Sequence, residues 1–316
     1  MRKHTTSHVS VSIIVFLLLL VIGQAAEGQT TRTWVSVYGN DANDCSRATP
    51  CRTLSGALAN TSAGGEIDIL DSGGFGSVTI DKSISVIAPP EVLGGIQVSG
   101  TNGIVISAGN TSVIVLRGLT IEGLGTGLTG IKVLSAGAVH VEKCTINNFT
   151  QSGIEFVPSS PTITTAQLHV SHTIVRDNFG ANTAGIHIKP GTNVMAVGEI
   201  ENTQLRNNSA GLRVEDNSTV TAKHTTAANN TGSGFIAVSI GAAVNLNLDS
   251  CVASGNGFGI RADGSANASV RFANCMIAGN GTGISSNLGG RTVSVTGTNF
   301  NLDSGTATGP NIAPQR

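Results

Sequence analysis

A short apolar phrase recurs along the chain from residue 130 onward. A glycine is followed by a large apolar residue, then by a variable residue and usually by a second apolar one. The phrase begins at Gly130, Gly153, Gly185, Gly211, Gly234, Gly259 and Gly283. Successive glycines lie 23 to 32 residues apart, and a period in that range is typical of stacked structural repeats. The pattern therefore predicts coils that each pack on the preceding one.

Upstream of the phrase, from residue 66, apolar residues alternate at period two. The alternating pairs are Ile67 and Ile69, Val78 and Ile80, Ile84 and Val86, Ile96 and Val98, and Ile104 and Ile106. Glycine, proline and aspartate separate these short segments, which is typical of strands joined by turns. Because no helical pattern lies between them, we expect parallel strands connected as flat coils rather than by helical crossovers.

Two further columns repeat with the same period. One holds mostly small residues: Leu119, Cys144, Thr173, Thr203, Thr225, Cys251, Cys275 and Thr298. The other, a few residues later, holds asparagines: Asn148, Asn178, Asn208, Asn230, Asn256 and Asn280. Asparagine tolerates the left-handed conformation of a sharp corner, and stacked side-chain amides can hydrogen bond from one strand to the next. We therefore expect these six residues to form a structural ladder.

The N-terminus has the pattern of a secretory signal over residues 1–26. Arg2 and Lys3 precede an apolar run, and small residues follow it at positions 23, 25 and 26. A retained anchor is the alternative. Cleavage would give a protein that is secreted, periplasmic or on the cell surface, with no membrane contact. Residues 27–65 then predict a cap, made of a strand over 33–38, a cysteine loop and a helix over 52–60. Residues 66–305 form the coils, and residues 306–316 a flexible tail.

The coils, the ladder and the cap helix together resemble the right-handed parallel β-helix of the pectate-lyase-like superfold. The resemblance covers residues 34 to 305. It implies an all-β, single-stranded parallel β-helix of about ten coils with a short N-terminal cap helix. This scaffold carries lyases, hydrolases, epimerases, adhesins and structural modules, so the resemblance does not select an activity.

The cysteines fall into two groups. Cys45 and Cys51 are close in sequence, and in an exported protein this spacing predicts a disulfide; a metal-binding pair is the alternative. Cys144, Cys251 and Cys275 belong to the small-residue column and are expected to be buried thiols. A disulfide between Cys251 and Cys275 is also compatible with neighbouring positions in a stack.

Side chains after the Gly-apolar step point outward on neighbouring coils and gather charge. They form one candidate patch, which comprises Glu155, His187, Lys189, Arg213 and Glu215. One interpretation is a solvated strand face with alternating charge. The other is a shallow polysaccharide-binding or catalytic site.

Composition limits what this patch could do. The net charge of −1, with 12% charged residues, does not favour a nucleic-acid partner. The acidic residues are scattered and no converging carboxylates are evident, so we expect no metal and no cofactor. Calcium would be needed only by a lyase. The sequence favours a secreted, non-catalytic binding or structural module, with a polysaccharide or cell-surface glycan as its possible partner. The alternative is a divergent polysaccharide lyase or glycoside hydrolase acting on an acidic polysaccharide. The oligomeric state stays open.

Overall fold

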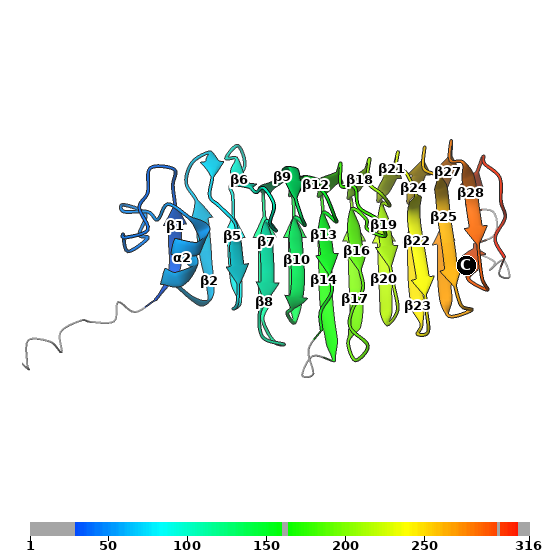
Figure 1. Cartoon of the computed structure of the whole chain (residues 1–316), viewed down its shortest axis with the longest axis horizontal. Coiled ribbons are helices and arrows are strands. Elements are labelled where there is room, and N and C mark those ends of the chain that lie inside the picture. The colour runs from blue at the N-terminus through cyan, green and yellow to red at the C-terminus, as the bar shows by residue number, and fades with distance from the viewer. Residues whose placement is uncertain (1–28, 160–163, 296–297, 309–316) are drawn as a thin grey trace, which may run out of the picture.

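The computed structural model describes residues 29–159, 164–295 and 298–308. Its strands stack into an elongated rod, with the N-terminal cap at one end and the final coils at the other (Figure 1). All pairings between the described strands are parallel, and they form three sheets. The expected parallel β-helix is therefore confirmed. The expected signal segment lies outside the described residues.

From β4 onward, each coil contributes one strand to each sheet in the order C, A, B. Sheet A contains β1 (Thr30–Val35), β2 (Thr61–Ile69), β5 (Ile84–Ile87), β8 (Val113–Arg117), β11 (Ala138–Glu142), β14 (Thr165–Ser171), β17 (Met195–Glu201), β20 (Ser218–Lys223), β23 (Val244–Asp249), β26 (Ala268–Ala273) and β29 (Arg291–Ser294). Sheet B contains β3 (Gly73–Gly74), β6 (Gly94–Gln97), β9 (Leu119–Gly127), β12 (Thr145–Phe149), β15 (Ile174–Arg176), β18 (Gln204–Arg206), β21 (Thr226–Ala228), β24 (Val252–Ser254), β27 (Met276–Ala278) and β30 (Phe300–Asn301).

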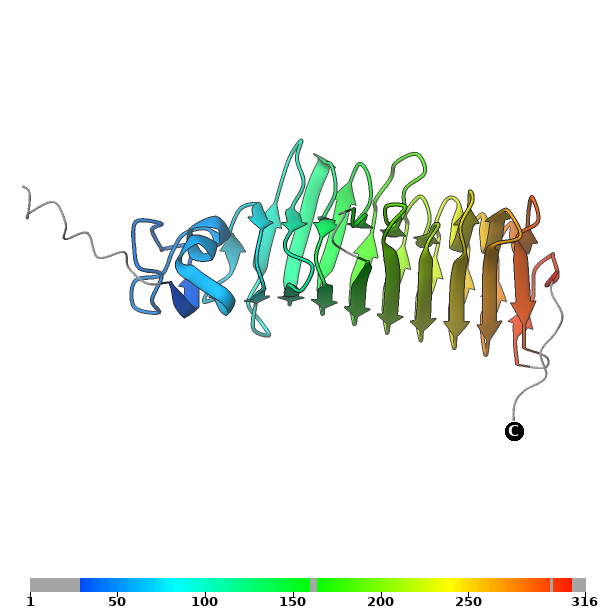
Figure 2. The same cartoon turned by 90° about the horizontal axis from the view of Figure 1, so that it is seen from below.

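Sheet C contains β4 (Val78–Ile80), β7 (Ile104–Ser107), β10 (Ile131–Ser135), β13 (Ile154–Phe156), β16 (Ile186–Ile188), β19 (Leu212–Val214), β22 (Ser233–Ser239), β25 (Phe258–Gly264) and β28 (Thr282–Ser286). Its nine described strands correspond to about nine turns, close to the ten expected. Figure 2 shows the same stack after a quarter turn about its long axis. The buried apolar residues of the three sheets form one core cluster.

The recurring Gly-apolar phrase lies at the start of the sheet C strands. Its apolar residues stack in register across neighbouring coils, as Ile154, Ile186 and Leu212 do, and are fully buried. The glycine that precedes them is required because the backbones of adjacent coils approach closely. A Cβ atom at Gly211 would lie 2.4 Å from the carbonyl oxygen of Gly234 in the next coil. The phrase therefore marks both the core and the corner before it.

The cap helix α2 (Leu54–Asn60) begins after Thr53, whose side-chain oxygen accepts a hydrogen bond from the backbone N–H of Gly56. Leu54, Ala57 and Leu58 form its buried face, so the expected helix is present. The helix packs against β1, β2 and β4 and covers the N-terminal end of the stack. Burial of this apolar face stabilises a helix too short to form alone.

The first strand of the cap differs from expectation. The first strand covers Thr30–Val35 rather than 33–38, because the chain turns after Val35 and Ser36 and Val37 hydrogen bond to the carboxylate of Asp71. In the tail expected from residue 306, the hydroxyl of the exposed Thr308 lies 3.0 Å from that of Ser286, and the flexibility of the tail stays a prediction. Residues 309–316 lie outside the described part.

The cysteine predictions are confirmed. Cys45 and Cys51 form a disulfide with their Cα atoms 4.6 Å apart, and it fixes the loop before α2. Cys144, Cys251 and Cys275 are free and buried. Their Sγ atoms contact backbone carbonyl oxygens, as Cys251 does with Ala222 at 3.3 Å. They act as small core residues whose S–H groups, which are weak donors, have carbonyl oxygens as acceptors.

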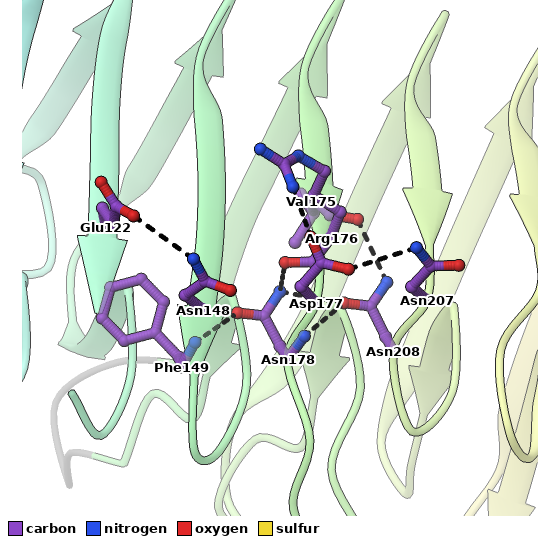
Figure 3. A network of polar contacts seen from close by, with 9 residues as sticks. All are labelled: Glu122, Asn148, Phe149, Val175, Arg176, Asp177, Asn178, Asn207 and Asn208. Atoms are coloured by element: carbon purple, nitrogen blue, oxygen red, sulfur yellow. Dashed lines mark hydrogen bonds and ion pairs between the residues drawn. The ribbon is translucent and has the colours of Figure 1, made fainter. Parts of the chain in front are cut away.

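The asparagine ladder runs through five of the six expected residues. The side-chain amide of Asn178 donates to Oδ1 of Asn208 at 2.9 Å (Figure 3), and that of Asn230 donates to Asn256 at 2.8 Å. Asn208 donates to Asn230 at 3.3 Å, and Asn256 donates to Asn280 at 2.9 Å. The same Oδ1 atoms accept backbone N–H groups of the preceding coil. Each described amide thus connects two coils and holds the corner between sheets B and C.

Asn148 is not part of this ladder, which corrects the prediction. It lies beside Asp177 in the stack, and Phe149 takes the ladder position, where its backbone N–H donates to Asn178 Oδ1 at 3.1 Å (Figure 3). Asn148 and Asp177 both have left-handed backbones, with φ of 63° and 59°. The structure therefore separates two columns that the sequence merged: one supplies left-handed corners and the other stacks amides.

Candidate functional site

The predicted patch lies on the outer face of sheet C. Glu155, His187 and Arg213 occupy one position on β13, β16 and β19, paired in register as Glu155 with His187 and His187 with Arg213. Lys189 and Glu215 follow two residues after His187 and Arg213, so they point to the same side. The structure thus brings all five residues to one face.

Glu215 is the centre of the cluster. Its Oε1 atom lies 2.9 Å from Nε2 of His187 and 2.7 Å from Nε of Arg213. Its Oε2 atom lies 3.4 Å from Nζ of Lys189. One carboxylate is therefore shared by two cationic side chains and one imidazole, which is a stronger arrangement than isolated pairs on a solvated strand face.

Exposure separates the members of the cluster. The side chains of His187 and Glu215 are 7% and 6% exposed, whereas that of Lys189 is 56% exposed. The sequence predicts that all five point outward, but not that they shield one another. Ile236, the next residue in register after Arg213, is also buried on this face and packs with Ala184 and Ala210. Lys189 is thus the most accessible charge of the cluster.

The protonation of Glu215 follows from these contacts. Burial opposes its ionisation, but the hydrogen bonds from His187 and Arg213 outweigh burial and lower the pKa of Glu215 to about 2. The group is therefore ionised at all moderate pH values. A carboxyl group in this state accepts hydrogen bonds and balances charge, but it is a poor proton donor at neutral pH.

The second nitrogen of His187 has no partner within the described structure. Nε2 contacts Glu215, whereas Nδ1 is buried without a hydrogen bond. When Nε2 carries the proton and donates it to the carboxylate, Nδ1 is left as an acceptor. The cluster therefore contains an oriented imidazole with one free lone pair.

Further ion pairs lie at the two ends of the patch. Glu155 contacts Lys132 on β10, with Nζ and Oε2 separated by 2.9 Å. Arg261 contacts Asp263 at 2.9 Å and lies over the ring of Phe258. The sequence places Lys132 and Arg261 on the same outward column, but the specific partners depend on rotamers that a repeat pattern does not contain.

These residues do not fit a calcium site. Calcium requires several oxygen ligands that converge, mostly carboxylates. On this face Glu155, Glu215 and Asp263 each contact a cationic side chain instead. Within the described residues, no group of three or more His, Cys, Asp or Glu side chains is arranged to hold a metal ion. We therefore assign no step to calcium.

Over residues 29–159, 164–295 and 298–308, none of the helices has the length and apolar character to cross a bilayer.

Comparisons with known proteins identify similar folds rather than close relatives. No protein-family model matches the sequence, and a search of curated proteins finds no match. Among solved structures, the chain is similar to pectate lyase Pel9A, with 17% identity, a TM-score of 0.61, and coverage of 90% of this chain and 82% of that one. It is also similar to the GH136 lacto-N-biosidase from Eubacterium ramulus, with 12% identity and a TM-score of 0.54.

The second likeness covers 92% of this chain but 59% of the lacto-N-biosidase chain, so this chain spans little more than half of that protein. At these identities the likeness concerns the backbone. The three parallel sheets and the coil order show a parallel β-helix, and the likeness to pectate lyase Pel9A shows that the two proteins share this fold.

Proposed function

We propose that this protein binds an acidic glycan on the outer face of sheet C, without cleaving it. The observation that carries the proposal is the cluster around Glu215. Lys189 and Arg213 are both cationic, and a single ionised carboxylate neutralises only one of them. Whatever the charge of the His187 ring, the cluster keeps at least one excess positive charge, which favours an anionic partner.

The fold likeness supports a saccharide as the class of ligand. The two similar structures are by name a pectate lyase and a lacto-N-biosidase, and both names refer to carbohydrates. A sheet face made of parallel strands presents side chains at a regular spacing of about 4.8 Å per coil, which suits an extended, repeating polymer. Lys189, the accessible cation, would make the first contact with such a chain.

The pairing of both acidic groups of the patch with cationic side chains favours binding over hydrolysis. Glycoside hydrolysis needs two carboxyl groups, one of them protonated. The carboxylates of Glu155 and Glu215 are each in contact with a cation, and Glu215 has a pKa of about 2. Neither group is arranged to donate a proton to a leaving oxygen at neutral pH.

A second candidate function is supported by His187 alone. Its Nδ1 is an acceptor without a partner, and Glu215 orients the ring. An imidazole held in this way can act as a general base, as proton abstraction from an acidic sugar would require. The 7% exposure of the side chain counts against direct contact with a substrate. We therefore place cleavage second.

The test compares binding and cleavage with the same polymers. Binding of polygalacturonate and alginate is measured by calorimetry for the wild type, Lys189→Ala and the control Lys223→Ala, which removes a cation from sheet A. Loss of one charge contact predicts about tenfold weaker binding for Lys189→Ala. The control is expected to match the wild type. The absence of wild-type binding, or equal binding by Lys189→Ala, would contradict the proposal.

Cleavage is followed in the same samples by the ultraviolet absorbance of unsaturated products and by new reducing ends. We expect neither signal. If products appear with the wild type and disappear with His187→Ala, the second candidate function is correct and binding is only its first step.

A further inference from the structure

A cavity lies at the N-terminal end of the same face of sheet C, away from the charged patch. Its volume is about 580 Å³, within the range of about 300–1,000 Å³ typical of small-molecule sites. One wall is helix α2, and the others are formed by β4, β7 and the turns beside them. It shares no residue with the cluster around Glu215.

The fold explains why the cavity is closed at one end. The first described strand of sheet C is β4, whereas sheet A continues beyond it with β2 and β1. Helix α2 packs against β4 and occupies the place where a further sheet C strand would lie (Figure 1). A polymer that followed the sheet C face toward the N-terminus would therefore meet the helix and stop.

The cavity is continuous with the column that carries the patch. Thr79 on β4 pairs with Val105 on β7, and Val105 pairs with Lys132 on β10. Thr79 and Val105 both line the cavity, whereas Lys132 begins the charged part of the face. The outer face of sheet C therefore changes from neutral at its closed end to charged in its middle.

Hydroxyl and carboxamide groups dominate the polar part of the lining. They belong to Gln29, Ser55, Ser77, Thr79, Thr101 and Asn102. Such groups both donate and accept hydrogen bonds, as the hydroxyls of a sugar do. Asp81 and Lys82 also line the cavity, and their opposite charges leave it without net charge. An ionic ligand is therefore not favoured.

Asn102 has an unsatisfied group at this site. Its Oδ1 atom is buried and has no hydrogen-bond partner within the described structure. A buried acceptor without a donor is unfavourable, and this atom is shielded in the present side-chain position. A rotation of the Asn102 side chain that turned Oδ1 toward a ligand hydroxyl would therefore gain a hydrogen bond that the described structure does not provide. Leu58 and Val105 add apolar surface to the same cavity, which suits the C–H face of a sugar ring.

We propose that this cavity binds a neutral sugar residue at the end of a saccharide chain. The hydroxyl-rich lining and the unsatisfied Asn102 select an uncharged polyhydroxylated ligand, and helix α2 limits the cavity to a chain end. This inference does not depend on the acidic-glycan proposal, because it concerns different residues and a ligand without charge.

The test uses a panel of neutral linear oligosaccharides, with cyclic or end-blocked forms of the same sugars. Binding is measured by saturation-transfer NMR and calorimetry. We expect at least one linear oligosaccharide to bind the wild type, with saturation strongest on a terminal residue. The cyclic or end-blocked form is expected to bind at least about tenfold more weakly.

Two variants test whether the ligand binds in this cavity. Asn102→Ala removes the carboxamide, and Ser55→Phe fills the cavity from an exposed position of α2. Both are expected to lose binding while keeping the wild-type circular dichroism spectrum and melting temperature. Thr219→Phe, which introduces the same side chain at a separate cavity on sheet A, is the matched control and is expected to bind normally.

Three outcomes would overturn the proposal: no binding of any neutral oligosaccharide by the wild type, full binding by folded Ser55→Phe, or loss of binding in Thr219→Phe instead. Lys189→Ala is expected to bind the neutral oligosaccharide like the wild type. A failure of the acidic-glycan proposal would leave this result unchanged, so the two proposals can be judged separately.

Discussion

Asp303 accepts hydrogen bonds from both the backbone N–H and the side-chain amide of Asn280, at 2.9 and 2.7 Å. Its other oxygen accepts the backbone N–H of Gly279 at 2.8 Å. The asparagine ladder therefore ends on a carboxylate, a group that only accepts. This is the appropriate terminus, because every amide of the ladder donates toward the C-terminal end and the last one needs an acceptor.

The first prediction concerns this terminus. Asp303→Ala should destabilise the last coils, whereas Asp303→Asn should keep most of the stability, since its Oδ1 atom can still accept from Asn280. Amide hydrogen exchange at Gly279 and Asn280 measures the effect locally. Faster exchange in Asp303→Ala than in Asp303→Asn is expected, and equal exchange in the two variants would show that the carboxylate does not close the ladder.

The same group predicts a pH dependence. The hydrogen bond from the Asn280 backbone lowers the pKa of Asp303 below its ordinary value of 3.8. A lowered pKa in the folded state means that this stabilisation is present above pH 3.8 and is lost as the pH falls through the folded-state pKa. Protection of the Asn280 amide against hydrogen exchange should therefore fall at acid pH in the wild type. In Asp303→Asn the side chain at position 303 does not titrate, so this part of the pH dependence should be absent.

A second prediction compares the two asparagine columns. Asn230→Ala removes a side chain that accepts from Asn208 and donates to Asn256 and to the carbonyl of Leu205. It leaves the buried backbone N–H of Asn208 without its acceptor and takes a donor from the Leu205 carbonyl. We expect the free energy of unfolding to fall by about 2–4 kcal/mol, since each unsatisfied buried group costs about 1–3 kcal/mol. Asn148→Gly is the control, because glycine adopts the left-handed backbone and only one side-chain contact, to Glu122, is lost. Urea denaturation measures the free energy of unfolding of both variants. A similar loss of stability in Asn230→Ala and Asn148→Gly would contradict the separation of the two columns.

A third prediction tests the ion cluster. Glu215→Gln keeps the shape of the side chain but leaves Arg213 and His187 without a carboxylate. Removing the carboxylate leaves a buried charge without its partner. We therefore expect the free energy of unfolding to fall by about 3 kcal/mol. Glu199→Gln, a change at an exposed ion pair on sheet A, is expected to cost less than about 0.5 kcal/mol.

The pH dependence of this cluster has a definite sign. The pKa of Glu215 is lowered from 4.5 to about 2, so its contribution is complete above pH 4.5 and declines as the pH falls toward 2. The difference in stability between the wild type and Glu215→Gln should shrink over this interval. Denaturation midpoints recorded at several pH values measure it, and a constant difference would mean that the carboxylate is not held by its two hydrogen bonds.

A fourth prediction concerns the thiols. Burial raises the pKa of the Cys144 thiol to about 12, and Cys251 and Cys275 are equally hidden in the core. The thiolate is the reactive form, so alkylation at mildly alkaline pH should add no label to the native protein. Mass spectrometry should find three labels after denaturation and five after denaturation with reduction. Labelling of the native protein would show that the core opens.

Much of the fold could be predicted from the sequence because the repeat carries its own alignment. A Cβ atom on the glycine before Ile154, Ile186 or Leu212 would lie too close to a neighbouring side chain or backbone, those of Val175, Asn208 and Gly234 respectively. The alternation after the glycine separates inward from outward side chains. The same alternation places Cys251 in the core and His187 on the outside of the sheet. These are consequences of backbone geometry, which a periodic sequence records directly.

Other features depend on tertiary detail that no period contains. The sequence did not distinguish Asn148 from the ladder, because the two columns are adjacent and asparagine suits both. It did not show that His187 and Glu215 are shielded by their neighbours, or that Glu155 contacts Lys132. The cavity beside α2 was missed because it arises where the cap meets the first coils, and that junction occurs once.

The direction of the amide ladder also bears on how such a chain can grow or shrink. Between Asn178 and Asn280, each coil offers the same donor to its successor and the same acceptor to its predecessor. A block of one whole coil, such as residues 208–229, could be removed or duplicated and the new neighbours would still match. The ends are different: Phe149 and Asp303 terminate the row and have no equivalent within it. Gene duplication can therefore lengthen the rod in the middle, while its two termini stay unique.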